Sequence, residues 1–350
     1  MTITIVIRSK DEADRLRLTL TSLACQAASA DIIVVDDGSS DRTPQVIAQA
    51  RRTMSLTAIR HDQPRGRAAA ANAGARAASG DVLVFLDGDT LAGPGFVAAH
   101  EAAHARNRTL CGRGETYHIR QTRLLLDPEA GTPQPGQAER LARLPAAERA
   151  AMKVTRQQIA EDFAAIDRRA SPGVYPGAGP RALYELEIAA LRDHPDCTVL
   201  WMAASGSNLS VRRDAFLAHG GFDETLGHII DHREMPLRLC QSGCRMGFVP
   251  GARSYHLIHR SGWTGADPLQ HPQWDANLYR RHRLPEVRLL VVLWASLADP
   301  SPVPPAARIL SLPALELAAR GETGIDYEAV RRAIPGFAAH KDSDTVVCVT

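Results

Sequence analysis

Short apolar runs alternate with helical patterns along the first part of the chain. Apolar runs at residues 2–7, 31–35, 56–59 and 82–86 predict β-strands. Helical patterns separate these runs, and the clearest is the alanine-rich segment 68–78. Because strand and helix alternate, the pattern predicts a doubly wound, mostly parallel sheet covered by helices.

One of these runs ends in an unusual way. Val82–Leu86 is apolar at every position, which is typical of a strand buried on both faces of a parallel sheet. It is followed directly by Asp87, Gly88 and Asp89. Ligands bind at the carboxyl ends of such strands, and two carboxylates beside the phosphates of a substrate suit Mg²⁺ or Mn²⁺. The alternative is a glycine-centred turn whose acids are only solvated.

Two further polar clusters stand at equivalent places. The second strand ends in Asp36 and Asp37, which offer acceptors to a ligand or, alternatively, cap the helix that follows. Gly66 and Arg67 begin the alanine-rich helix. A helix N-terminus with a cation favours phosphate, although a solvated arginine is the simpler explanation.

The pattern changes near residue 120, and we divide the chain accordingly into four segments. Pro- and Gly-rich stretches around a helical pattern predict a mainly helical insertion at 120–195 between two halves of one domain, 1–119 and 196–262. Residues 247–250 and 252–259 read as a last pair of strands. Residues 263–350 predict a helical C-terminal extension, which we expect to pack on the domain or form a homodimer, since Leu289–Leu293 is too apolar to stay exposed.

Composition and charge argue against a few classes of function. The chain has 350 residues, of which 45% are apolar, and its net charge of +2 gives no reason to expect nucleic acid or a membrane surface as a partner. The six cysteines show no pairing rhythm, no apolar run is long enough to span a membrane, and the chain opens on a strand rather than a signal peptide. We therefore expect a cytoplasmic protein with reduced thiols. The first strand lacks the glycine fingerprint of NAD enzymes.

Taken together, the motifs resemble those of a known family. They are, in order, Val34–Asp41, Gly66-Arg67 with Ala71–Gly74, Phe85–Asp89, and Asn208–Arg213 with Gly220–Glu224. This set resembles an inverting family 2 glycosyltransferase with the GT-A fold, from about residue 2 to residue 260 except for the insertion. The resemblance implies a nucleotide-diphospho-sugar transferase fold, with a Rossmann-like, mostly parallel sheet.

The resemblance also implies roles for individual residues. It assigns to the donor, taken as a UDP-sugar, the residues Arg8, Asp36, Asp37, Arg67, Asn72, Asp87 and Asp89. Among these, Asp37 is assigned to the base, and Asn72 is either a donor contact or an inward structural residue. A Mn²⁺ or Mg²⁺ cofactor would be bound by Asp87, Asp89 and His256, with Asp89 the more direct ligand and His259 a weaker candidate.

The catalytic base is where the chain departs from the family. The family places an Asp at the start of a helix to deprotonate the acceptor, but that position here is His232, with Asp231 before it and Glu234 after it. Histidine can act as a general base near neutral pH, so either Asp231 or His232 is a candidate, and Glu234 is next. Pro236 suggests that the helix starts near Arg233.

Two functions remain open from the sequence. One is a metal-dependent inverting transfer of a sugar to a saccharide, a peptide or a small natural product. The other is a weak or inactive relative that binds a nucleotide sugar as a partner protein. A nucleotidyltransferase would usually carry a glycine-rich loop after the first strand, where this chain has Arg8–Glu12.

Overall fold

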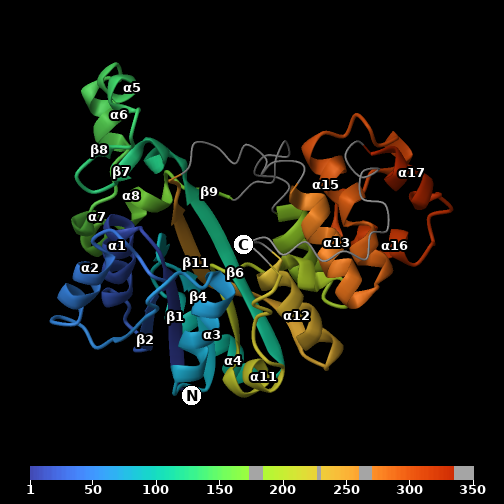
Figure 1. Ribbon diagram of the computed structural model, residues 1–350, viewed down its shortest axis with the longest axis horizontal. Helices are drawn as coiled ribbons and strands as arrows, with labels where there is room; N and C mark the ends of the chain where they lie inside the picture. The colour runs from blue at the N-terminus through green and yellow to red at the C-terminus, as the bar shows by residue number, and fades with distance from the viewer. Residues whose placement is uncertain (173–183, 227–229, 260–269, 335–350) are drawn as a thin grey trace. The chain divides into compact units, whose positions relative to one another are not determined.

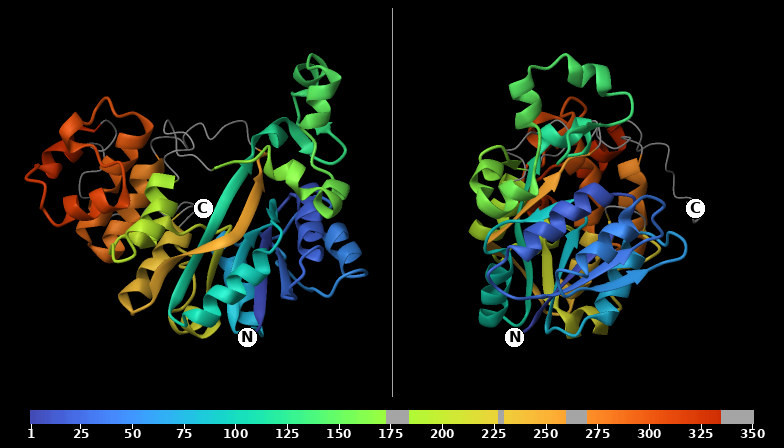
Figure 2. Two further views of the ribbon diagram at one scale, coloured as in Figure 1. Left: turned by 180° about the vertical axis from the view of Figure 1, so that it is seen from behind. Right: turned by 90° about the vertical axis from the view of Figure 1, so that its left-hand side faces the viewer.

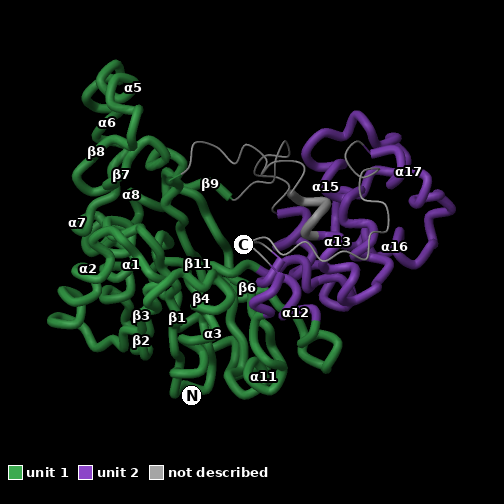
Figure 3. The backbone as a smooth tube through the Cα atoms, in the orientation of Figure 1, with its two compact units in different colours: residues 1–172, 205–222, 238–262 green, residues 173–204, 223–237, 263–350 purple. Residues whose placement is uncertain are grey.

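The computed structural model describes residues 1–172, 184–226, 230–259 and 270–334, except for the side chains of residues 270–274. The chain forms two compact units, which Figure 3 shows in different colours. Unit 1 consists of residues 1–172, 205–222 and 238–262, and unit 2 of residues 173–204, 223–237 and 263–350. The four segments named from the sequence stay a prediction.

The described strands all lie in unit 1. They are β1 (Ile3–Ser9), β2 (Asp31–Asp36), β3 (Thr57–Arg60), β4 (Val82–Asp87), β5 (Thr90–Ala92), β6 (Leu110–Ile119), β7 (Leu125–Asp127), β8 (Thr132–Pro133), β9 (Ser171–Pro172), β10 (Leu209–Arg212) and β11 (Arg245–Leu257). Within the described residues, nine of them form one sheet in the order β3-β2-β1-β4-β10-β6-β11-β5, with β9 beside β6. Strands β1 to β4 are parallel, whereas β10 and β5 run antiparallel to their neighbours.

The helices complete both units (Figures 1 and 2). In unit 1 they are α1 (Ala13–Ala24), α2 (Thr43–Ala50), α3 (Arg67–Ala77), α4 (Phe96–Arg106), η1 (Arg120–Leu124), α5 (Ala138–Ala142), α6 (Ala146–Ala151), α7 (Arg156–Glu161), α8 (Phe163–Asp167) and α11 (Arg213–Ala218). In unit 2 they are η2 (Tyr184–Ile188), α10 (Ala189–Asp193), η3 (Leu200–Ala203), α13 (Gln270–His282), α14 (Pro285–Arg288), α15 (Leu290–Ala298), η4 (Pro305–Ala307), α16 (Leu312–Ala319) and α17 (Tyr327–Ala333). Helix α12 (Asp231–Gln241) contributes residues to both units.

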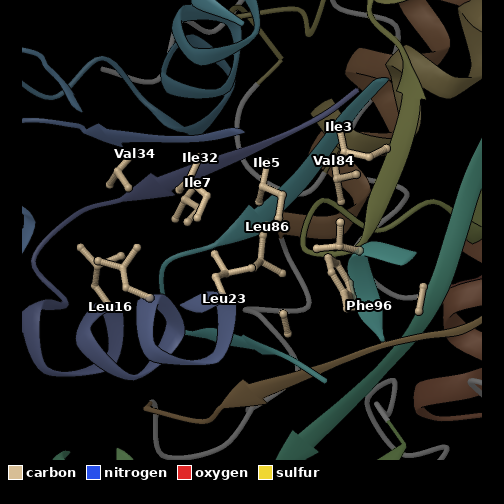
Figure 4. Packing of buried hydrophobic residues seen from close by; sticks show 14 of the residues in the cluster. Ile3, Ile5, Ile7, Leu16, Leu23, Ile32, Val34, Val84, Leu86 and Phe96 are labelled. Atoms are coloured by element: carbon tan, nitrogen blue, oxygen red, sulfur yellow. The ribbon is translucent and has the colours of Figure 1, made fainter. Parts of the chain in front are cut away.

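One face of the sheet carries the main hydrophobic core. Alternate residues of β1, such as Ile5 and Ile7, point to this face, because successive side chains of a strand point to opposite sides. Leu16 and Leu23 of α1 pack against them, as Figure 4 shows, and α2 and α4 complete the layer. Helix α3 lies on β1 and β2 from the other side, where a Cβ at Gly74 would collide with Val6. The predicted layered α/β fold is therefore confirmed.

The last strand differs from its prediction. Residues 247–250 and 252–259 were expected to form two strands, but Arg245–Leu257 is one strand, β11, parallel to β6. Its register with β6 shifts between Phe248 and Arg253, around Pro250 and Gly251. Proline and glycine thus mark a bulge here and not a turn, because proline is tolerated in a sheet at such irregular positions.

Two buried histidines join α4 to the sheet. His100 contacts Ser210 Oγ through Nδ1 at 2.9 Å and Asn208 Oδ1 through Nε2 at 3.1 Å. His104 Nε2 lies 2.9 Å from the same Ser210 Oγ. Burial lowers the pKa of His100 to about 3 and that of His104 to about 4. Both imidazoles are therefore neutral at pH 7.

Unit 1 should consequently lose stability in mild acid. Between pH 6.5 and 4 these histidines bind protons in the unfolded chain but not in the folded one, so the free energy of unfolding falls as the pH falls. We expect a loss of about 2 kcal/mol per histidine between pH 7 and pH 5. Urea unfolding of the wild type and of His104→Gln at both pH values would measure this, and the variant should lose less. Equal losses in both proteins would contradict the assignment to His104.

The C-terminal helices bury the apolar run noted in the sequence. Leu290, Val292 and Leu293 of α15 are at most 1% exposed. Helix α13 packs on α14 and α15, and α16 contacts η2. The described helices of the tail thus belong to unit 2, together with residues 184–204 and 230–237. Among the described residues, no helix is both long and apolar enough to cross a membrane.

Candidate functional site

A carboxylate and two imidazoles meet at the edge of the sheet in unit 1. Asp89 follows β4, His256 lies near the end of β11, and His259 is two residues beyond it. Each histidine places Nε2 3.0 Å from Asp89 Oδ2. The strand pairing explains the meeting, because β11 runs antiparallel to β5 and sets His256 opposite Thr90.

These three residues form a possible site for a metal ion, and we call them the metal group. One ligand atom from each lies within 4.8 Å of the others, and this is the one such group among the described residues. A carboxylate with two imidazoles fits Mn²⁺ and neighbouring transition metals better than Mg²⁺, which prefers oxygen ligands alone. Asp89 and His256 were predicted as ligands, whereas His259 was the weaker candidate and Asp87 lies outside the group.

Asp89 and His256 each stabilise the charged form of the other. Although burial opposes ionisation of Asp89, the charges and hydrogen bonds of His256 and His259 hold its pKa well below the ordinary value. Burial likewise opposes protonation of His256, but Asp89 raises its pKa. The group therefore carries an ionised carboxylate, which is the form that binds a cation.

Asp87 has different partners from Asp89. Its Oδ1 accepts a hydrogen bond of 2.7 Å from Arg8 Nε, and its Oδ2 lies 3.2 Å from Arg67 Nη2. Parallel pairing of β1 and β4 sets Arg8 opposite Asp87, and Arg67 is the first residue of α3. Two arginines and a helix N-terminus thus meet at the strand end, where they would suit the phosphates of a ligand.

A further carboxylate lies behind the turn between the two aspartates. A Cβ at Gly88 would collide with the Glu12 carboxylate and with Ser9, so only glycine allows this close approach. Burial raises the pKa of Glu12 well above its ordinary value, and the negative charges of Asp89 and Asp87 add to the effect. Glu12 was not among the predicted site residues.

The acids after β2 hold the neighbouring loops. Asp36 is 1% exposed, accepts from the Ser39 backbone N–H at 2.9 Å, and pairs with Arg60. Asp37 accepts from the backbone N–H groups of Arg65 and Gly66, both at 2.8 Å. Asp37 thereby fixes the segment that leads into α3.

The other contacts of these predicted donor residues are also internal. Asp37 Oδ1 lies 2.7 Å from His61 Nδ1. Asn72 donates through Nδ2 to the Phe222 carbonyl at 2.8 Å and accepts from the Phe222 N–H at 2.9 Å. The contacts of Asn72 are those of the structural alternative named from the sequence. The assignment of Asp37 to a nucleotide base stays a prediction.

The three candidates for the base lie on α12, within unit 2. Asp231 is 2% exposed and accepts from the His232 backbone N–H at 2.8 Å, while His232 Nδ1 lies 3.3 Å from the same oxygen. Glu234 is fully buried, with Oε1 3.0 Å from His282 Nε2. The helix begins at Asp231, two residues before the predicted start, so Pro236 lies inside it.

Sequence reasoning missed one aromatic neighbour of the metal group. His118 of β6 is the register partner of His256, and the two rings meet edge to face with centroids 5.4 Å apart. Burial, followed by the charge of His256, lowers the pKa of His118 to about 3. No sequence pattern singled out His118, because its place depends on the pairing of β6 with β11, which lie far apart along the chain.

Comparison with known proteins now bears on these findings. Residues 4–145 match the family model described as glycosyl transferase family 2. This part of the chain is thus similar to glycosyl transferase family 2. The matched region includes Arg8, Asp37, Arg67 and Asp89, whereas both histidines of the metal group lie beyond it.

The curated relatives agree over a short region. Validoxylamine A glucosyltransferase from Streptomyces hygroscopicus subsp. jinggangensis is 36% identical over 107 residues, which cover 29% of this chain and 25% of the relative. The uncharacterized glycosyltransferase YfnE from Bacillus subtilis is 34% identical over 116 residues, covering 32% of this chain and 30% of the relative. The matches therefore span about a third or less of these relatives.

Solved structures show the same fold over nearly the whole chain. A mannosyltransferase from Pyrobaculum calidifontis, in complex with GDP-Man and Mn²⁺, has a TM-score of 0.52 and 17% identity over 96% of this chain and 84% of its own. Staphylococcus aureus TarS has a TM-score of 0.50 and 13% identity, covering 96% of this chain and 81% of its own. At such identities the likeness establishes the fold alone.

Proposed function

We propose that this chain is a metal-dependent, inverting glycosyltransferase that moves a sugar from a nucleotide-diphosphate donor to an acceptor hydroxyl or amine. The observation that carries the proposal is the meeting of Asp89, His256 and His259 beside the paired Asp87. A cation held by the first three residues would neutralise charge on the departing diphosphate.

The chain's own residues supply the rest of the proposed mechanism. Arg8 and Arg67, both already at Asp87, would hold the diphosphate and keep the sugar in place. Asp231, the base that the resemblance suggests, would take the proton from the attacking acceptor. The direct attack breaks the bond to the diphosphate and inverts the anomeric carbon.

The names of two similar proteins suggest which acceptor and donor to test first. One curated relative is named as a validoxylamine A glucosyltransferase, and we propose the acceptor in this name as the first to test. The Pyrobaculum enzyme was solved with GDP-Man. We propose UDP-sugars as the first donors to test and GDP-mannose as the second.

A thermal-shift screen of nucleotide sugars with Mn²⁺ or with EDTA tests the proposal. A donor at about a hundred times its Kd should add about 2.7 kcal/mol to the free energy of unfolding, and only with the metal. Release of nucleoside diphosphate, measured on the same samples, separates an enzyme from a partner protein that only binds. Equal shifts with Mn²⁺ and EDTA would contradict a metal-bridged donor, and binding without turnover would favour the inactive relative.

A further inference from the structure

Helix α1 carries a stripe of buried polar residues beside its apolar face. Arg15, Thr19 and Ser22 are each at most 4% exposed, and Gln26 continues the row beyond the helix end. Residues three or four apart lie on the same side of a helix, so these side chains form one line. A helix that only covers a sheet would carry leucine or valine there.

The middle of this line binds the backbone around the two aspartates. Thr19 Oγ1 donates to the Gly88 carbonyl at 2.9 Å. Ser22 Oγ accepts from the Ala92 N–H at 2.9 Å, and Gln26 Nε2 donates to the Gly93 carbonyl at 3.0 Å. The stripe therefore fixes the chain on both sides of Asp89.

Arg15, at the other end of the line, reaches residues 256–259, which we call the histidine segment. Its Nε donates to the Leu257 carbonyl at 3.2 Å, while Nη1 and Nη2 donate to the carbonyls of Leu126 and Leu125 at 2.9 and 2.6 Å. Leu257 follows His256 directly. Binding α1 to β7 alone would need only the two Nη groups, so the Nε contact serves the segment with the histidines.

A backbone hydrogen bond between the two ligand-bearing parts of the chain closes a ring between Thr19 and Arg15. The Leu257 N–H donates to the Asp89 carbonyl at 2.9 Å. The path thus runs from Thr19 to Gly88, from Asp89 to Leu257, and from Leu257 back to Arg15. It joins the two distant parts of the chain that supply the three ligands.

The two residues after Leu257 are held in the same way. Thr122 Oγ1 donates to the Ile258 carbonyl at 2.8 Å, and Gln134 Nε2 donates to the His259 carbonyl at 3.2 Å. Three successive carbonyls of the histidine segment are therefore each bound by a side chain. A loop that only connects two elements would not need such anchoring. Metal ligands need it, because they must be held within about 0.5 Å of the required geometry.

We propose that Arg15 and Thr19 are positioning residues, which hold Asp89, His256 and His259 at the spacing that a divalent cation requires. This inference rests on the metal site of the proposed function. Neither residue touches the metal or the donor; both act through the backbone on either side of the ligands. Lysine cannot replace Arg15, because one ammonium does not reproduce a fork that reaches three carbonyls.

The test is the Kd for Mn²⁺, measured by electron paramagnetic resonance of the free ion, for full-length Arg15→Lys and Thr19→Val. We expect Arg15→Lys to weaken binding about tenfold, as the loss of outer partners of metal ligands does, and Thr19→Val to act in the same direction. The double variant should lose less than the product of the two, since both belong to one ring. Urea unfolding should be recorded alongside.

Matched controls lie on the same helix. Arg17→Lys changes an arginine that pairs with Asp14, Asp127 and Glu129, and Thr21→Val changes a threonine that bonds only along the helix, to the Arg17 carbonyl. Both controls should keep the wild-type Kd. Their unfolding free energies show how much of any change is due to stability.

The outcomes separate the two proposals. Wild-type Kd values in folded Arg15→Lys and Thr19→Val, or equal weakening in the controls, would overturn the positioning role. If Arg15→Lys does not fold, Thr19→Val decides alone. No Mn²⁺ binding by the wild type would overturn the metal site and this inference with it, whereas normal Mn²⁺ binding without sugar transfer would overturn only the proposed function.

Discussion

Asp89→Ala should remove sugar transfer and the Mn²⁺-dependent part of donor binding together. Asp89 is the acceptor that both histidines share, so its loss removes the one anionic ligand of the group. A metal that stabilises the departing diphosphate contributes several kcal/mol, which corresponds to at least about a thousandfold in rate. The measurements are turnover at saturating Mn²⁺ and thermal shift with donor, with and without EDTA.

Asp81→Ala is the matched control for this variant. Asp81 precedes the same strand at its opposite end and accepts from the Thr2 N–H at 2.9 Å. Its removal should leave turnover and the metal dependence unchanged. Far-UV circular dichroism should show both variants folded. A donor shift in Asp89→Ala that still requires Mn²⁺ would contradict the assignment of the metal to this group.

Replacing the catalytic base should lower kcat strongly and leave donor binding near normal. We expect Asp231→Asn to reduce kcat by about 10²–10⁴-fold, which is the usual contribution of general-base catalysis. His232→Ala should have the smaller effect. The structure gives Asp231 Oδ1 two contacts from His232, so the histidine can hold the carboxylate in place.

The pH profile of kcat/KM distinguishes the two residues independently. If Asp231 is the base, activity should persist to a lower pH than a histidine base allows, because carboxyl groups ordinarily titrate well below imidazoles. If His232 is the base, activity should already fall in mildly acidic solution. Wild-type rates in both Asp231→Asn and His232→Ala would exclude both residues as the catalytic base. Glu234 would then be tested, although its full burial against His282 favours a structural role.

The strands were predictable where one physical signal dominates. The apolar runs in β2 and β4 reflect burial on both faces of a sheet, and runs this short are typical of strands and shorter than most helices. The continuity of β11 was harder to predict from the sequence. Pro250 and Gly251 usually mark turns, and only the pairing partners on both sides kept the strand continuous through the bulge.

The site was predictable only as far as local sequence carries it. Asp87 and Asp89 are recognisable in the sequence because they follow a buried strand. That Asp87 contacts arginines whereas Asp89 contacts two histidines depends on the pairing of strands, which the local sequence does not reveal. His259 was underrated because β11 ends at Leu257, after which the backbone leaves strand geometry and both histidines can reach one oxygen. Arg15 gave no sequence signal, since a polar residue near a helix start normally faces water.

The pairing of β5 with β11 has a consequence for how such chains can recombine in evolution. β5 follows Asp89 directly, and within the described sheet it is bound at the edge by β11, more than a hundred and fifty residues later. A gene segment that ends with the family match at residue 145 would leave β5 unpaired and Asp89 without its histidines. A recombination that keeps Asp89 together with its two histidines therefore has to carry the distant strand along, so the parts that must be inherited together are discontinuous in the gene.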